Sequence, residues 1–347
     1  MRSRVTILDV AAEAQVSIAS VSAALNDRPG VSTETRARIL AVADRLGWVP
    51  SLRGRSLSGK RAYAVGLVLE RATTVLESDP FFAAFIAGVE SVLERRGYAL
   101  VLQMAGTHKA ATERYRRMAL DHRVDGVFLT DMAATDPRVP LLRDLGLPAV
   151  AVNSDPGCEL PSVRQDHLPG LRSLVEQVVA LGHSDVAHLA GRRGLIHTRQ
   201  RLAVWRSVLV DAGLRPGPVV YGDFSTESGS RAAPRLLAGP TPPSAVVCAS
   251  DLMAVGLVSG AGALGLDVPS DLSVTGFDGI EIGGFLRPSL TTVATAPRRL
   301  GAAAAETLLR LLDGDRVEDV EIEATTPVLR GSLVAPRPTR SVPPRNV

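Results

Sequence analysis

The chain has 347 residues, too many for one ordinary domain, so two or three compact units are expected. Hydrophobic residues make up 46% and charged residues 22%, a composition typical of globular proteins with ample core. The two cysteines, Cys158 and Cys248, form no CxxC pair, which argues against a disulfide framework and a zinc site. The chain has no apolar N-terminal segment and no stretch of about 18 uncharged apolar residues, so we expect a cytoplasmic protein without membrane spans.

The net charge of +3 is unevenly distributed along the chain. Residues 1–61 carry ten Lys or Arg and five Asp or Glu, whereas the rest of the chain is close to neutral. A basic N-terminal segment on a near-neutral body favours a polyanion as the partner of that segment alone. A solvated basic surface without a partner has the same composition, so charge alone leaves both interpretations open.

The first 61 residues predict three short helices. Thr6 to Asp9 has the spacing of a capping box, which starts a helix through about Gln15. Ser17 caps a second short helix, and Ser32 caps a third that ends at Gly47. Three short helices with a tight turn between the first two are typical of a helix-turn-helix unit. The second helix is then the recognition element, which enters the major groove of DNA.

The predicted recognition helix contains neither Lys nor Arg. Its outward positions are expected to be Ile18, Ala19, Ser22 and Ala23, because the other face is apolar. Serine hydroxyls in this segment can position the helix on phosphates without reading sequence: Ser17, Ser20 and Ser22. Small apolar side chains contact thymine methyl groups but form no bidentate hydrogen bonds to guanine or adenine. We therefore expect weak direct readout by this helix.

Residues 50–61 predict a marginal helix between two folded units, a segment suited to folding upon binding. Gly54 to Lys60 also satisfies the first seven positions of a phosphate-binding P-loop. Arg61 stands where the Ser or Thr that holds Mg²⁺ is required, and no strand precedes Gly54. Nucleotide hydrolysis is therefore not expected here.

From residue 62 onward, apolar runs typical of strands alternate with helical patterns. Strands are expected at 63–69, 98–103, 124–129, 148–152, 185–190, 244–249 and 271–277. Helices are expected at 81–96, 109–121, 168–181, 198–212, 226–238, 251–264 and 297–313. This alternation predicts two doubly wound parallel sheets of five or six strands each, with a first crossing between lobes near 155–166. The Pro- and Arg-rich tail, 333–347, is expected to be disordered.

Enzyme signatures are absent from the sequence, which has no GxGxxG after a strand, no HExxH and no GxSxG. We therefore predict no catalytic residue, no metal site and no cofactor. His183 and His188 have a spacing that fits neither one helical face nor a metal pair, so both are expected to be structural. Cys248 lies in an apolar run and is expected to be a buried small side chain.

The segment from Val5 to Lys60 resembles the headpiece and hinge of the LacI/GalR family of transcriptional repressors. The body is similar to that family in a series of motifs in the same order: "DPFFAAFIAGVESVLERRGY", "VDGVFL", "LGHSDVAHLAG", "RLAVW", "CASDLMAVGLVSGAGALGLDVPSDLSVTGFDG" and "PSLTTV". The resemblance spans about residues 5–333 and implies a core like a type I periplasmic binding protein. It implies a headpiece at 1–49, a hinge at 50–61 and a core at 62–332. The N-lobe is then about 62–165 with 295–325, and the C-lobe about 166–294 with 326–332.

The resemblance implies a DNA-binding surface formed by the headpiece and hinge. The implied contact residues are Thr6, Ser17, Ile18, Ala19, Ser20, Ser22, Ala23, Asn26, Arg28, Arg53, Arg55, Ser56 and Leu57. Leu57 matches the family residue that wedges into the minor groove from paired hinge helices. Two hinges must meet for this, so a homodimer on palindromic double-stranded operator DNA is expected.

The resemblance also implies a small-molecule effector in the cleft between the lobes. The implied contact residues are Phe81, Phe82, Asp166, Leu195, His197, Arg201, Phe224, Ser250, Asp251 and Asp278. Carboxylates, an arginine and aromatic faces suit a polyol ring, which favours a sugar, with a purine or nucleoside as the alternative.

The sequence as a whole thus predicts a dimeric, operator-binding repressor under allosteric control by a small molecule, and not an enzyme. Two other classes stay open at this point. One is a sugar-binding module for transport or sensing without DNA activity, and the other is an enzyme that acts on a sugar or nucleotide.

Overall fold

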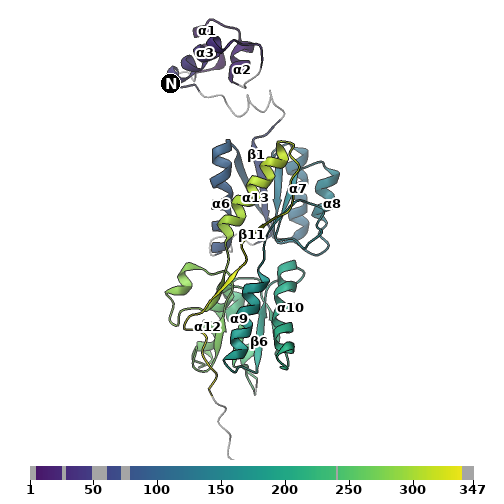
Figure 1. Ribbon diagram of the computed structural model, residues 1–347, viewed down its shortest axis with the longest axis vertical. Helices are drawn as coiled ribbons and strands as arrows, with labels where there is room; N and C mark the ends of the chain where they lie inside the picture. The colour runs from purple at the N-terminus through teal and green to yellow at the C-terminus, as the bar shows by residue number, and fades with distance from the viewer. Residues whose placement is uncertain (1–4, 26–28, 49–60, 72–78, 240, 338–347) are drawn as a thin grey trace, which may run out of the picture. The chain divides into compact units, whose positions relative to one another are not determined.

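The computed structural model of the chain describes residues 5–25, 29–48, 61–71, 79–239 and 241–337. It contains a helical unit that ends at Tyr63 and an α/β unit that begins at Ala64 (Figure 1). Several predictions lie outside the described residues: the DNA contacts Asn26, Arg28, Arg53, Arg55, Ser56 and Leu57, the P-loop-like segment 54–60, nearly all of the hinge, and the tail from residue 338.

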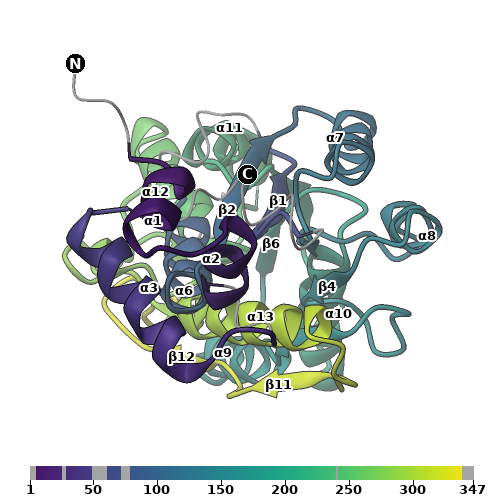
Figure 2. The ribbon, with the colours of Figure 1, turned by 90° about the horizontal axis from the view of Figure 1, so that it is seen from above.

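The three predicted helices of the N-terminal unit are confirmed as α1 (Ile7–Glu13), α2 (Ile18–Leu25) and α3 (Thr33–Arg45), drawn in purple in Figure 2. The capping box forms, because the backbone N–H and the hydroxyl of Thr6 donate to Asp9 Oδ2 at 2.7 and 2.8 Å. Ser20 N–H donates to Ser17 Oγ at 3.1 Å, which caps α2. Both caps fix where the chain enters a helix.

The core of the helical unit is small and apolar. One side chain from each helix is fully buried: Val10, Val21 and Ile39. Smaller residues complete this core, including Ala14 and Ala24. The opposite side of α2, which carries Ile18 and Ala19, is exposed as the sequence predicts.

The N-lobe of the α/β unit is a six-stranded parallel sheet in the order β11-β5-β4-β3-β1-β2. Its strands are β1 (Ala64–Leu69), β2 (Ala99–Met104), β3 (Gly126–Leu129), β4 (Ala149–Val152), β5 (Ser162–Gln165) and β11 (Val320–Ile322). Helices α6 (Pro80–Arg96) and α13 (Pro297–Leu312) pack side by side on one face (Figures 1 and 2). Helices α7 (His108–Leu120) and α8 (Arg138–Asp144) lie on the other.

The C-lobe contains a four-stranded parallel sheet in the order β7-β6-β8-β9. Its strands are β6 (Val186–Ala190), β7 (Val219–Tyr221), β8 (Ala245–Cys248) and β9 (Ser273–Thr275). Its helices are α9 (Leu168–Ala180), α10 (Ile196–Asp211), α11 (Thr226–Leu237), α12 (Asp251–Ala263) and the short 3₁₀ helix η1 (Glu281–Gly284). Two further strands, β10 (Thr292–Ala294) and β12 (Thr326–Val328), pair antiparallel with each other.

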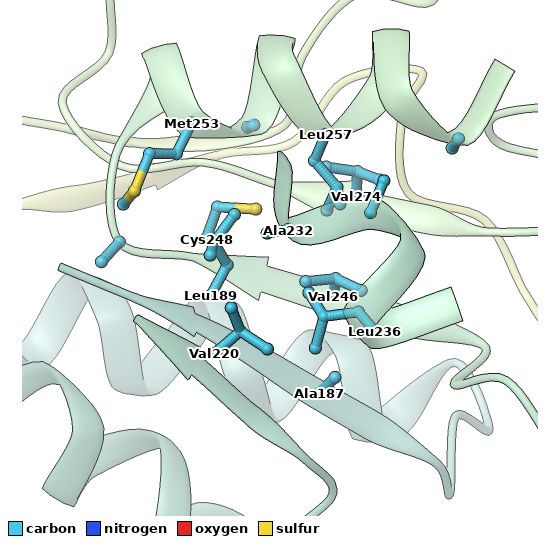
Figure 3. Packing of buried hydrophobic residues seen from close by; sticks show 14 of the residues in the cluster. Ala187, Leu189, Val220, Ala232, Leu236, Val246, Cys248, Met253, Leu257 and Val274 are labelled. Carbon is cyan, nitrogen blue, oxygen red and sulfur yellow. The ribbon is translucent and has the colours of Figure 1, made fainter. Parts of the chain in front are cut away.

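Apolar cores cover both faces of the C-lobe sheet. Val246 and Cys248 of β8 point toward α11 and α12, where they meet Leu236 and Leu257 (Figure 3). The alternate residues of β8 belong to the core beneath α9 and α10. Because each face carries a helical layer, the strand is apolar at every position. The expected burial of Cys248 is confirmed, with none of its surface exposed.

The fold prediction is confirmed for all seven predicted strands and all seven predicted helices of the α/β unit, with shifts of at most two residues at their ends. It is wrong for the second sheet, which has four strands where five or six were expected. This sheet contains the three strands predicted for it and β7, and β10 and β12, which were not predicted, form a separate ribbon. One ribbon strand leads into α13 of the N-lobe and the other returns from β11, so they run in opposite directions.

Among the described residues, no single helix is long and apolar enough to cross a membrane. Within the described part of the chain, α1 and α2 are long and apolar enough only when taken together, and the pair is bent by 103° at its junction.

Candidate functional site

A pocket lies between the two lobes of the α/β unit, at the carboxyl ends of strands from both sheets. This edge is where open parallel sheets bind their ligands. Its N-lobe wall is formed by residues that follow β1, β3 and β4 and by the start of α6, and its C-lobe wall by α10 and by residues that follow β7, β8 and β9. The lining residues are Arg71, Asp79, Phe81, Phe82, Thr130, Asp131, Val152, Asn153, His197, Arg201, Phe224, Ser250, Leu252 and Asp278.

The N-lobe wall contains a buried ion pair. Arg71 Nη2 lies 3.0 Å from Asp131 Oδ2, and each side chain is 7% exposed. The guanidinium carbon of Arg71 lies 5.7 Å from the ring centre of Phe82 and 5.0 Å from that of Phe224. Among the described residues, Arg71 Nε and Nη1 have no hydrogen-bond partner. This wall therefore presents cationic N–H donors that are shielded from water.

The C-lobe wall contains a second arginine held in a similar way. The guanidinium carbon of Arg201, on α10, lies 3.6 Å from the ring centre of Phe277. Arg201 Nη1 donates to the carbonyl oxygen of Ala249 at 2.7 Å, and its Nε has no partner within the part of the chain that the structure describes. His197 lies one helical turn earlier, and its ring centre is 5.4 Å from that of Phe224.

Backbone conformations that L-residues rarely adopt gather around the pocket. Four of the seven described non-glycine residues with positive φ line it: Asp131 (φ 50°), Asn153 (φ 53°), Phe224 (φ 73°) and Asp278 (φ 122°). Each lies directly after the carboxyl end of a strand: β3, β4, β7 and β9. Strained residues of this kind persist where the surroundings hold them, and they cluster at binding sites.

Burial determines the charge states in the pocket. It raises the pKa of the Asp278 carboxyl well above its usual range, an effect that the nearby Arg201 opposes. Burial lowers the pKa of Arg201 to about 10, against its acidic neighbours, so the guanidinium stays charged at neutral pH. Burial also lowers the pKa of His197 well below its usual range, which leaves a neutral imidazole. The pocket thus combines cationic donors, carboxyl groups and a neutral imidazole beside aromatic faces.

Seven of the ten predicted effector residues line this pocket: Phe81, Phe82, His197, Arg201, Phe224, Ser250 and Asp278. Three do not. Asp166 lines a neighbouring cavity, and its Oδ1 accepts from Leu168 N–H at 3.0 Å. Leu195 is buried beside the pocket without lining it.

Asp251 is fully buried behind the pocket wall. It accepts from Thr292 Oγ1 at 2.6 Å and from Ile280 N–H at 2.8 Å, and so holds the turn that carries Asp278. Its contacts are those of a positioning residue.

Seven lining residues were missed by the sequence analysis: Arg71, Asp79, Thr130, Asp131, Val152, Asn153 and Leu252. Five of them lie at or directly after the ends of β1, β3 and β4. The strands themselves were predicted, so the rule that ligands bind at carboxyl ends was the available signal.

Contacts between the lobes flank the pocket on two sides. Arg192, in the loop after β6, donates to the carbonyl oxygen of Glu70 at 3.1 Å, and its Nη2 lies 3.3 Å from Glu70 Oε1. Glu70 Oε2 in turn lies 3.0 Å from His108 Nδ1. On another side, Asp155 pairs with Arg199 and accepts from Gln200 Nε2 at 2.9 Å. These contacts hold the two walls of the pocket together.

Most of the described DNA-contact candidates lie on α2 or directly before it. Ile18 is 46% exposed, and Ala19 beside it is also exposed. Ser17 Oγ lies 2.9 Å from Ser20 Oγ at the same end of the helix. Ser22 and Ala23 are half-buried one turn later, and Thr6 is exposed at the start of α1. The start of α2 therefore presents hydroxyls and small apolar side chains on one surface.

Comparison with known families matches both units. Residues 6–51 match the family described as bacterial regulatory proteins, lacI family. Residues 175–333 match the periplasmic binding protein-like domain.

Individual proteins are similar over almost the whole chain. The HTH-type transcriptional repressor CytR of Escherichia coli K12 is 32% identical over 95% of this chain and 96% of its own length. The structure of the Lac repressor dimer bound to operator and the anti-inducer ONPF superposes with a TM-score of 0.81 at 28% identity, over 96% of this chain and 100% of that one. A complex of the transcriptional regulator CelR with cellobiose gives a TM-score of 0.72 at 30% identity, over 95% of this chain and 100% of that one.

Proposed function

The chain belongs to the lacI family of bacterial regulatory proteins, and from this premise we propose that it is a repressor whose homodimer binds a palindromic operator. The headpiece, 1–49, and the hinge, 50–61, form the DNA-binding part. The core, 62–332, binds a small-molecule effector between its lobes. The observation that carries the proposal is that one chain combines two features. Helix α2 begins at a capped end and presents exposed residues there, and the two sheets of the core share one polar pocket.

Affinity for DNA comes in this proposal mainly from basic residues elsewhere in the first 61 residues of the chain. Phosphate neutralisation by these residues releases counterions, so binding weakens steeply as salt rises. The candidates are Arg2, Arg4, Arg28, Arg36, Arg53, Arg55 and Lys60. Contacts from Ile18 and Ala19 add a small apolar reading surface suited to thymine methyl groups. More of the specificity then comes from the hinge and from DNA deformability.

A sugar is the effector class that the pocket fits best. Asp278 and Asp79 supply carboxyl groups, Arg201 supplies a forked donor, and the ring faces of Phe81 and Phe224 can stack on the C–H faces of a sugar. A related regulator of known structure, CelR, was crystallised with cellobiose. A purine or nucleoside is the alternative, because the same aromatic rings can stack on a base. Ligand binding biases the closure of the lobes and thereby the pairing of the hinges.

Operator binding by the full chain tests the proposal. A palindromic duplex selected from a random pool is titrated with the purified dimer by fluorescence anisotropy at several salt concentrations. We expect specific binding whose logarithm falls linearly with the logarithm of salt concentration, and a change in affinity when a binding sugar is added. DNA binding that is absent or independent of salt contradicts the proposal.

Substitution at Leu57 tests the hinge. Leu57→Ala is expected to weaken binding to the selected palindrome at least tenfold while non-specific binding stays nearly unchanged, because the wedge acts only at a bent site. Leu120→Ala, which removes a leucine that is 63% exposed on α7, is the matched control. Equal losses on both kinds of DNA count against the wedge.

A further inference from the structure

The effector pocket holds two arginines in matching arrangements, one on each lobe. Arg71 contacts the ring faces of Phe82 and Phe224, and Arg201 stacks on Phe277. Each guanidinium is fixed at one end by an oxygen atom, from Asp131 for Arg71 and from Ala249 for Arg201. Stacking and a fixed end together leave little freedom for either guanidinium to turn away.

Both arginines line the same pocket. Arg71 Nε and Nη1 and Arg201 Nε are buried and have no hydrogen-bond partner among the described residues. Buried donors of this kind cost free energy until a ligand supplies acceptors. These three nitrogens carry four N–H groups on two cations, a donor set that a neutral hydroxyl group satisfies only in part.

The acidic residues of the pocket do not cancel these cations. Asp131 already pairs with Arg71, so that pair is neutral as a unit. Asp278 and Asp79 are half-buried in the pocket, and desolvation raises the pKa of each carboxyl group. The two guanidinium groups that line the pocket can therefore attract an anionic ligand.

We propose that the effector is an anionic sugar derivative, whose carboxylate or phosphate group is held between Arg71 and Arg201. The proposal rests on the assignment of this pocket to a sugar effector and narrows it. Carboxylate and phosphate oxygens accept charge-assisted hydrogen bonds from guanidinium N–H groups, and these bonds are stronger than those to a neutral hydroxyl group. Arg71 then determines specificity, since it separates acidic sugars from their neutral parents.

A matched ligand panel tests the proposal on the full chain. Gluconate, glucuronate and glucose 6-phosphate are compared with glucose, galactose, cellobiose and adenosine by thermal shift and then by calorimetry. We expect at least one anionic member to bind ten times more tightly than any neutral member. Comparison of gluconate and glucuronate with glucose 6-phosphate then shows whether the pocket prefers a carboxylate or a phosphate.

Variants at Arg71 test the residue. Arg71→Met combined with Asp131→Asn removes the ion pair without leaving a buried charge, so the protein is expected to fold. In this double variant the ratio between the affinities for the anionic and the neutral ligand should fall close to one. Arg71→Lys should retain part of the preference. Arg193→Met is the control, because Arg193 also stacks on an aromatic ring, that of Tyr221 at 3.5 Å, but does not line the pocket.

The possible failures differ in what they overturn. Tighter binding of a neutral sugar, or an anion preference that survives in the double variant, overturns the anionic assignment and leaves the sugar pocket standing. Binding of adenosine alone, or of no panel member, overturns the anionic assignment together with the sugar assignment.

Discussion

At the scale of single residues, the α/β unit contains histidines held in the neutral form. His188 is fully buried on β6, with Nδ1 donating to the carbonyl oxygen of Val247 at 2.8 Å. Its ring stacks on Trp205 with centres 5.3 Å apart. Burial lowers the pKa of His188 to about 4, an effect that the bond to Val247 opposes. Burial also lowers the pKa of His167, to about 3.

These histidines should make the protein less stable in acid. Between about pH 6.5 and pH 4 the unfolded chain binds a proton at His188 that the folded chain does not bind, so stability falls as the pH falls. The loss for His188 is about 3 kcal/mol over that window. His188→Gln should remove this part of the slope, measured by urea unfolding from pH 4 to pH 7. The exposed His122, changed to Asn, is the control, and equal slopes for both variants contradict the prediction.

At the scale of elements, glycines set how closely helices pack in the C-lobe. A Cβ atom on Gly256 of α12 would lie 1.8 Å from the carbonyl oxygen of Thr226 at the start of α11. Gly262, near the end of the same helix, has open space at its Cβ position. The close packing of α11 on α12 therefore requires a glycine at position 256, whereas packing places no such requirement on position 262.

Opposite effects are expected when these two glycines become alanine. Gly256→Ala forces α11 and α12 apart and should destabilise the protein by about 1–3 kcal/mol. Gly262→Ala should stabilise it by up to about 1 kcal/mol, because alanine favours the helix. Urea unfolding of both variants at neutral pH measures the difference. Equal changes in the free energy of unfolding show that backbone contact between α11 and α12 is not the cause.

The elements that sequence analysis predicted are those with long apolar or amphipathic patterns, such as α6 and β6. Short elements were missed: β5, β7, β10, β11, β12 and α8. The segment of β11, Val-Glu-Ile, has no distinguishing pattern, and it is a strand because β5 pairs with it. Such strands are fixed by partners far away in the sequence, which a local pattern does not contain.

The same limit applies to the pocket. The resemblance located the residues that occupy family positions, including Arg201 and Asp278. Arg71 and Asp131 were missed because their significance lies in their pairing across 60 residues of sequence. Asp251 is of a residue type that often contacts ligands, but its carboxylate accepts hydrogen bonds from Thr292 and Ile280 instead. Whether a polar residue faces a ligand or a neighbouring loop is decided by tertiary contacts.

At the scale of the whole α/β unit, two ion pairs among the described residues link the lobes, Glu70 with Arg192 and Asp155 with Arg199. The pocket takes one wall from each lobe, so a ligand that touches both walls favours the closed arrangement. Partly exposed ion pairs add only about 0–1 kcal/mol each to folding. A small energy is nevertheless enough to shift an equilibrium between two lobe arrangements.

Removal of these links should therefore change lobe closure more than folding. In the double variant Arg192→Met with Arg199→Met, we expect a larger radius of gyration for the free core by small-angle X-ray scattering. The affinity for a sugar that binds the parent protein should fall in proportion to the fraction of closed molecules, because only those complete the pocket. Arg231→Met is the control, since Arg231 pairs with Glu227 and Asp223 within one lobe. If the double variant matches this control in scattering and in sugar affinity, the ion pairs do not govern closure, and the crossing segments near Asp166, Thr295 and Thr325 set it instead.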